Sequence, residues 1–118
     1  MMAREPILEN AIMLMLWQEP GPLTPRQVKS RLDPDHPVAY TTVMTVLTRL
    51  WSKGMLKRYR VGRAYAYAPT KSQALHAANR MEGILESVDD RAVTLGRFVE
   101  KLSVSDREEL MRVLNADD

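Results

Sequence analysis

The chain has 118 residues, of which 45% are hydrophobic and 27% charged, a composition typical of one modest globular domain or a small domain with an appendage. It has no cysteine, which excludes a disulfide framework, a thiol nucleophile and a cysteine-ligated zinc. Arg4 and Glu5 come too early for the apolar core of a signal peptide, and no apolar run approaches the roughly 20 residues that span a bilayer. We therefore expect a cytoplasmic protein that does not contact a membrane.

The net charge is only +2, but it is unevenly distributed. Residues 1–70 hold ten Lys or Arg against five Asp or Glu, whereas residues 71–118 hold seven against ten. Within the first part, residues 49–63 carry cations without any acid, at Arg49, Lys53, Lys57, Arg58, Arg60 and Arg63. A run of like charge is commonly a solvated face, but on two adjacent elements of a small domain it indicates an anion-binding surface.

Two helices are predicted before residue 33. The first has one apolar stripe, formed by Leu8, Ala11, Ile12, Met15 and Leu16. The sequence Pro20-Gly21-Pro22 ends it. Thr24, Pro25 and Gln27 then supply an N-cap, a proline at the first helical position and a capping-box glutamine for a short second helix to about Leu32.

After a turn at residues 33–37, a third helix is predicted from about Tyr40 to Lys53, with Gly54 as the glycine that ends it. Its apolar stripe consists of Val43, Val46, Leu47 and Leu50. The other side carries Thr41, Thr45, Thr48 and Ser52, with Thr42, Arg49 and Lys53 beside them. Threonine is a mediocre helix former, so this many on one helix favour a contact role over that of tolerated surface residues.

Residues 55–60 and 64–68 predict two short strands, because Tyr65 and Tyr67 alternate with alanine and Gly62 lies where the turn needs a positive φ. Pro69 closes this hairpin. Three helices followed by a two-stranded hairpin is the order of elements in a winged helix-turn-helix domain. We therefore expect a mainly α, α+β fold in which residues 1–70 form such a domain, with the hairpin as its wing.

Residues 71–118 predict three more helices. Thr70 and Gln73 form a second capping box, and the helix that follows has a seam at Ala74, Ala78, Met81, Leu85 and Val88. Ser103 and Asp106 cap the last helix. The apolar residues of the last two helices are Ala92, Leu95, Phe98, Val99 and Leu102, then Leu110, Val113 and Leu114. So short a segment cannot bury three apolar stripes alone. A second copy of the chain is the simplest partner surface, which predicts a helical dimerisation domain, and folding back onto residues 1–70 is the alternative.

Little in the chain predicts catalysis. His36 lies in the proline-rich turn and His76 on a helix, and neither has a glycine-framed serine near it. Acidic pairs such as Asp89-Asp90 are adjacent in sequence, as helix-end charges are. The sequence has no phosphate loop, dinucleotide fingerprint or His-Glu metal spacing. We expect neither an enzyme nor a protein with a cofactor or metal.

Double-stranded DNA, by contrast, suits the features of residues 1–70. Threonine hydroxyl and methyl groups on a helix in the major groove can contact base edges, and arginine can reach guanine acceptors or phosphates. The residues that we expect to contact DNA are Thr41, Thr42, Thr45, Thr48, Arg49, Lys53, Arg58, Arg60 and Arg63. Tyr65 and Tyr67 are expected to pack within the hairpin, because a duplex offers no free base face. Two such surfaces in one dimer predict a site with two-fold symmetry.

The stretch AYTTVMTVLTRLWSKGMLKRYRVGRAYAYAP, residues 39–69, resembles the β-lactamase (penicillinase) repressors of the BlaI/MecI type. It has a threonine-rich helix ending in Arg49-Leu50 and Lys53-Gly54, then a wing with Gly62-Arg63 and tyrosines leading to a proline. The likeness extends over nearly the whole chain, to the helix at residues 9–17 and to residues 98–114.

This resemblance implies a homodimeric transcriptional repressor of palindromic operators, in a family connected with antibiotic resistance, whose C-terminal helices form the dimer interface. It implies that Thr42, Thr45, Arg49 and Lys53 contact DNA. Family repressors are released when a membrane sensor triggered by β-lactam leads to proteolysis, typically at an Asn-Phe bond. The matching pair here is Arg97-Phe98, with arginine in place of asparagine. Many relatives control genes other than β-lactamases.

Two other functions remain compatible with the sequence. One is a winged-helix module that binds another protein, as some members of this superfold do. The other is a repressor that senses a small molecule, which would need an apolar pocket between the two halves. Phe98 is the only phenylalanine that could line such a pocket.

Overall fold

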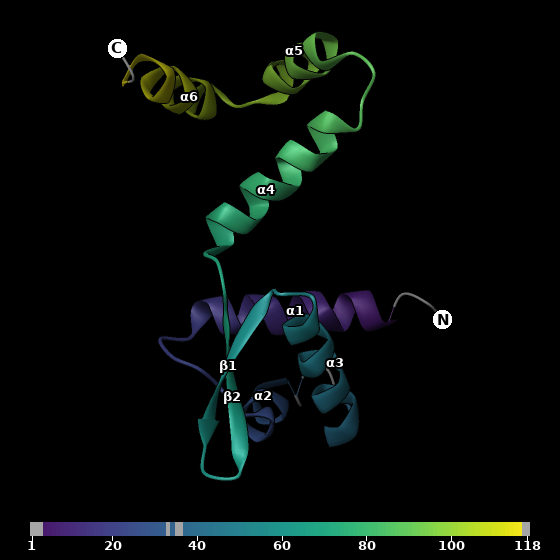
Figure 1. The fold of residues 1–118 in the computed structure, drawn as a ribbon. Helices are drawn as coiled ribbons and strands as arrows, with labels where there is room; N and C mark the ends of the chain where they lie inside the picture. The colour runs from purple at the N-terminus through teal and green to yellow at the C-terminus, as the bar shows by residue number, and fades with distance from the viewer. Residues whose placement is uncertain (1–3, 33, 35–36, 117–118) are drawn as a thin grey trace. The chain divides into compact units, whose positions relative to one another are not determined.

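The computed structural model describes residues 4–32, 34 and 37–116, with side chains described from residue 7 onward. Its elements are α1 (Arg4–Gln18), α2 (Pro25–Leu32), α3 (Tyr40–Ser52), β1 (Leu56–Val61), β2 (Ala64–Pro69), α4 (Gln73–Glu86), α5 (Arg91–Lys101) and α6 (Val104–Ala116). The two strands pair antiparallel, and the predicted mainly α, α+β fold is confirmed. Two compact units divide the chain, one up to His76 and one from Ala77 (Figure 1).

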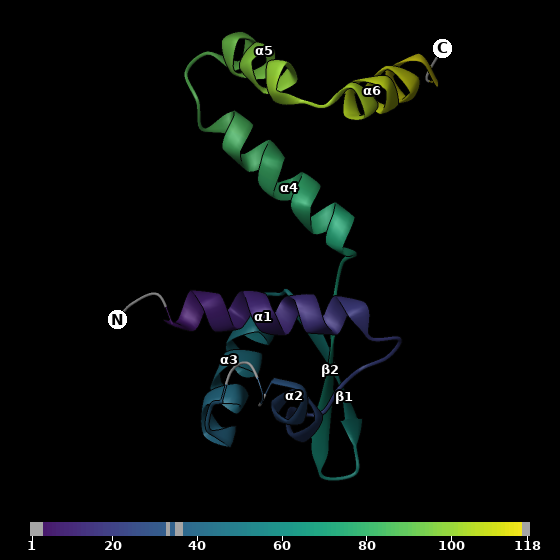
Figure 2. The ribbon, with the colours of Figure 1, turned by 180° about the vertical axis from the view of Figure 1, so that it is seen from behind.

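The first unit has one apolar core, and α2, α3 and the hairpin lie on the same side of α1 in both views (Figures 1 and 2). The predicted stripe of α3 is buried completely, and that of α1 is buried or packed against the core. Leu56 and Tyr67, at 2% and 1% exposed, join the hairpin to this core. The packing of these apolar faces holds α3 and the hairpin together in one unit.

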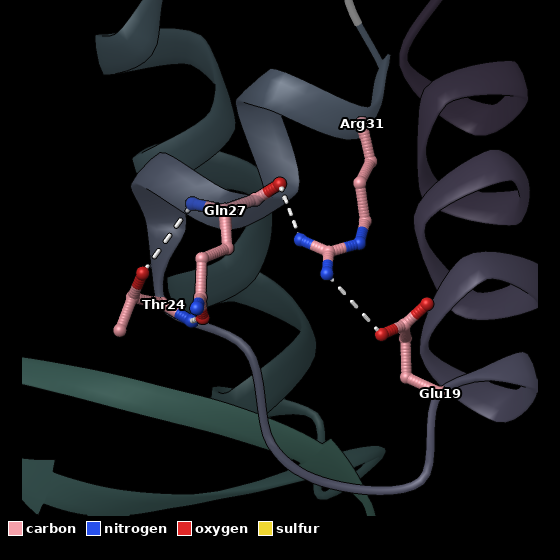
Figure 3. A network of polar contacts seen from close by, with 4 residues as sticks. All are labelled: Glu19, Thr24, Gln27 and Arg31. Carbon is pink, nitrogen blue, oxygen red and sulfur yellow. Dashed lines mark hydrogen bonds and ion pairs between the residues drawn. The ribbon is translucent and has the colours of Figure 1, made fainter.

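The predicted N-terminal cap of α2 is confirmed and forms part of a small polar network (Figure 3). The backbone N–H of Thr24 donates to Gln27 Oε1 at 2.9 Å, and that of Gln27 donates to Thr24 Oγ1 at 3.3 Å. Arg31 donates to the Gln27 carbonyl at 3.3 Å and pairs with Glu19 at 3.4 Å. The network fixes the start of α2 and joins α2 to the segment that follows α1.

The turn between α3 and β1 depends on Gly54, whose φ of 80° confirms its predicted place at the end of the helix. The Gly54 N–H donates to the Trp51 carbonyl and the Met55 N–H to the Leu50 carbonyl, both at 3.0 Å. These two bonds are the Schellman pattern, which satisfies the last carbonyls of a helix. Gly62 has the positive φ that the hairpin turn was predicted to need, at 60°.

The predicted capping box of Thr70 and Gln73 is wrong. Ser72 caps α4 instead, since its Oγ accepts from the Leu75 N–H at 3.1 Å. Thr70 closes the hairpin, because its hydroxyl donates to the Gly54 carbonyl at 2.9 Å and its N–H to the Met55 carbonyl at 3.1 Å. The sequences at Thr24 and Thr70 look alike, each with a glutamine three residues later. At Thr70, however, the backbone is hydrogen-bonded to the turn between α3 and β1, so no cap forms there.

The start of α4 belongs to the first unit and is held there by Trp17. The Trp17 indole N–H donates to the Lys71 carbonyl at 2.9 Å, and its ring lies 5.3 Å from that of His76. In the second unit, Ser103 accepts from the Asp106 N–H at 3.0 Å, as predicted. Of the turn predicted at residues 33–37, residues 33, 35 and 36, and hence His36, lie outside the described residues.

Candidate nucleic-acid interface

The face of α3 opposite its buried stripe is open to solvent, as the sequence predicts. Thr41, Thr45 and Thr48 are exposed, and Thr42 is half-buried. The Thr45 hydroxyl donates to the Thr41 carbonyl at 2.9 Å, so its proton stays within the helix. Its methyl group and the oxygen lone pairs are the parts that remain for a partner. A shallow open hollow lies along this face, lined by Met44, Thr45, Thr48, Arg49 and Ser52.

Arg49 and Lys53 share a carboxylate that the sequence did not predict. Glu9 of α1 lies 3.9 Å from Arg49 and 3.4 Å from Lys53, measured between nitrogen and oxygen atoms. Although residues 49–63 contain no acid, the fold thus supplies one from residue 9. Exposed ion pairs are weak, so Glu9 restrains and partly neutralises the two cations without removing them from solvent.

The pairing of the hairpin divides its cations between two faces. Leu56 pairs with Pro69, Arg58 with Tyr67 and Arg60 with Tyr65, and residues that lie opposite each other in an antiparallel pair point to the same side. Because Leu56 and Tyr67 point into the core, Arg58 and Arg60 extend the core side of the hairpin. Arg60 donates from Nε to the Gly62 carbonyl at 3.2 Å and stays exposed.

Arg63 occupies the turn of the hairpin and is exposed. Within the described part of the chain no ion pair or hydrogen bond is made by its side chain. Lys57, on the outer face of β1, is exposed as well, with its ammonium 5.9 Å from the Tyr59 ring. These two residues and Arg60 form the cationic part of the hairpin that solvent reaches.

Arg58 is placed differently from the other cations. Its guanidinium carbon lies 3.6 Å from the centroid of the Trp51 ring and 4.0 Å from that of Tyr65. Both distances are within the range of a cation–π contact. Tyr67 is buried in the core and Tyr65 is half-buried against it, so both tyrosines pack within the unit, as predicted.

A second hollow lies beside α2 and the start of α3, and no sequence motif predicts it. It is lined by Arg26, Lys29, Ser30 and Tyr40. The Arg26 guanidinium lies 5.9 Å from the Tyr40 ring, and Lys29 donates to the Val38 carbonyl at 2.8 Å. Arg26 and Lys29 thus place two further cations of the first unit on α2.

Three of these partners could not be found from local spacing alone. Glu9 is 44 residues from Lys53, and no periodicity connects them. Trp51 and Tyr65 belong to different elements from Arg58. The alternation of β1, with Leu56 two residues before Arg58, was the one available signal that Arg58 faces the core side.

The candidate dimerisation residues are in contact with solvent. Within the described residues, α4, α5 and α6 contain no buried side chain. Among the large apolar candidates, Met81 is 54%, Phe98 45% and Leu114 59% exposed. The others are Ala74, Ala78, Leu85, Val88, Leu95, Val99, Leu102 and Leu110, which are exposed or half-buried. Arg97 and Phe98 lie inside α5, where Arg97 pairs with Glu100 at 3.6 Å.

None of the helices in the described part has the length and apolar character needed to cross a membrane. Across the same residues, no three His, Asp or Glu side chains gather where they could hold a metal ion.

Comparisons with known proteins give consistent matches. A family model described as penicillinase repressor matches residues 7–116. The transcriptional regulator BlaI of Mycobacterium tuberculosis (strain CDC 1551 / Oshkosh) is 38% identical over 110 residues, covering 91% of this chain and 80% of that protein. The solution structure of the DNA-binding domain of the repressor BlaI is similar with a TM-score of 0.51 and 26% identity, covering 56% of this chain and 79% of that one. The complex structure of hsRosR-S1 gives a TM-score of 0.50 and 25% identity, covering 94% and 88%. The predicted winged-helix fold is thereby confirmed.

Proposed function

The chain belongs to the penicillinase repressor family, and from this premise we propose that it acts as a homodimer on operators with two-fold symmetry. As in the family, it is a DNA-binding transcriptional repressor. The observation that carries the proposal is that an exposed threonine face and a cationic hairpin belong to one compact unit. Residues 1–70 are the proposed DNA-binding domain and residues 71–118 the proposed dimerisation domain.

In this proposal α3 enters the major groove and the hairpin lies over the neighbouring backbone. The exposed side of α3 would present Thr41, Thr42, Thr45 and Thr48 to base edges, with Arg49 and Lys53 beside them. Arg60 and Arg63 would pair with phosphates, because the solvent-exposed guanidinium groups can each donate to phosphate oxygens.

The exposed apolar side chains of the second unit support self-association. Three helices without a buried residue leave more apolar surface in water than a small folded unit tolerates. A second copy supplies a matching surface, since a two-fold interface uses the same patch on both chains. Two linked DNA-binding units then contact two half-sites, and the second contact benefits from the first.

Release from the operator would follow from loss of the dimer. The family's cleavage position corresponds to Arg97-Phe98, inside α5. Proteases bind extended backbone, so a cut there requires α5 to open first. Cleavage would detach α6 and part of α5 from the proposed interface, and an inducer-activated protease is the partner that this route needs.

Selection of bound duplexes from a random pool with the purified chain tests the proposal. We expect a consensus of two inverted arms. The logarithm of the affinity should fall with the logarithm of the salt concentration, with a slope of about −0.9 per phosphate contacted. Equal affinity for every duplex, or an affinity that does not change with salt, would leave only non-specific binding or the protein-binding module that the fold also permits. Incubation with β-lactam-treated cell extract, followed by mass spectrometry, would locate a cut at Arg97-Phe98 or its absence.

A further inference from the structure

Arg58 lies against two aromatic rings from different elements. Trp51 belongs to the last turn of α3, Arg58 to β1 and Tyr65 to β2, so the three side chains join the end of the helix to both strands of the hairpin. The guanidinium carbon is 3.6 Å from one ring centroid and 4.0 Å from the other. At these distances the guanidinium is in cation–π contact with both rings.

The register of the hairpin explains why an arginine occupies this position. Leu56 and Arg58 point to the same side of β1, and Leu56 is buried in the core. Arg58 therefore continues the core side outward, where it meets the Trp51 and Tyr65 rings. Tyr65 is its diagonal neighbour across the strands, within reach of a long side chain.

We infer that Arg58 is a positioning residue that locks the hairpin to the end of α3, and that Trp51 and Tyr65 complete this lock. This inference rests on the proposed function, and it replaces the DNA contact that the sequence predicted for Arg58 with a positioning role. Arginine suits this positioning role because its flat, delocalised cation can stack on aromatic rings, whereas the compact ammonium of lysine cannot.

The lock has a consequence for DNA recognition. The turn between α3 and β1 is short, with only residues 53–55 between the two elements. With the hairpin fixed to α3, Arg60 and Arg63 reach the backbone at a set offset from the threonine face. Selectivity then depends on Arg58 and Trp51 although neither reads a base.

A double-variant cycle on the full chain tests the lock, with Trp51→Ala, Arg58→Ala and both together. The probes are the duplex selected from the random pool and a scrambled duplex of the same length. We expect each single variant to bind the selected duplex roughly 2- to 30-fold more weakly, the range of a cation–π contact, and the double variant to bind no worse than either. The loss on the scrambled duplex should be smaller, and the salt slope should stay that of the wild type.

Conservative variants separate positioning from charge. Arg58→Lys keeps the charge and should behave as Arg58→Ala, whereas Trp51→Phe keeps a ring and should restore most of the affinity. The inference is overturned if Arg58→Ala lowers the salt slope by about 0.9 and weakens both duplexes equally while Trp51→Ala has no effect, as for a phosphate contact.

A readout without DNA keeps the two proposals distinguishable. In urea unfolding followed by tryptophan fluorescence, both single variants should lower the midpoint and the double variant should lower it no further. Additive midpoint shifts would disprove the lock. If the wild-type chain selected no duplex, the proposed function would fail, while this cycle would still decide whether the three side chains act together.

Discussion

Arg63 is the cation whose setting fits a phosphate contact most simply. It lies in the hairpin turn, exposed, and makes no ion pair within the described part of the chain. Arg63→Ala should therefore weaken the selected and the scrambled duplex by the same factor and reduce the salt slope by about 0.9. Fluorescence anisotropy titrations at several salt concentrations measure both quantities.

The matched control is Arg91→Ala, which removes the same charge from the start of α5 in the second unit. It should leave the slope unchanged. An equal drop in slope for both variants would mean that the net charge of the chain, and not the hairpin, sets the salt dependence.

Thr45 allows the parts of one side chain to be tested separately. Its hydroxyl donates its proton to the Thr41 carbonyl, so the methyl group and the oxygen lone pairs are what it offers to DNA. If the methyl group packs on a thymine methyl, Thr45→Val should keep selectivity and Thr45→Ser should lose it, at a cost of about 1 kcal/mol on the selected duplex. The opposite order would show that the base contact is a hydrogen bond accepted by the hydroxyl oxygen. Competition titrations with both duplexes measure the ratio.

At the scale of elements, the turn between α3 and β1 can be tested at Gly54. Its φ of 80° disfavours any side chain, although a Cβ there would meet no atom within 4 Å. Gly54→Ala should therefore lower the free energy of unfolding by about 1–2 kcal/mol through backbone strain alone. Gly21→Ala is a matched control, since Gly21 has equally open surroundings and no positive φ. Urea unfolding of both variants measures the difference, and equal midpoints would show that strain at Gly54 is relieved elsewhere.

The elements themselves could be predicted because their causes are local. Apolar spacing located α1 and α3, and the residues Thr24 and Gln27 located the start of α2. The same local pattern failed at Thr70, because a bond to the Gly54 carbonyl, 16 residues away, outweighs a cap. In the candidate site, the exposed threonines followed from periodicity. The ion pairs of Glu9 and the contacts of Arg58 with the Trp51 and Tyr65 rings depend on how elements pack, which a single sequence does not reveal.

At the scale of the whole molecule, the two units differ in how far they bury their apolar side chains. The first buries its stripes in a core, whereas within the described residues the helices of the second bury none. The proposed self-association would resolve this difference by giving those side chains a partner. It also makes the stability of the second unit depend on protein concentration, because a dimer interface forms only when two chains meet.

Leu85→Asp tests this view of the molecule. Leu85 is a half-buried member of the predicted seam of α4, and a carboxylate there would have to be desolvated in the interface. We expect the variant to sediment as a monomer at micromolar concentration and to bind the selected duplex weakly, through one half-site at a time. Leu14→Asp makes the same change at an exposed leucine of α1, 46% exposed in the first unit, and should remain a dimer. If Leu85→Asp still sediments as a dimer, α4 is not the seam. If Leu14→Asp dissociates instead, the association surface includes α1, and the exposed apolar residues of the second unit must be covered in another way.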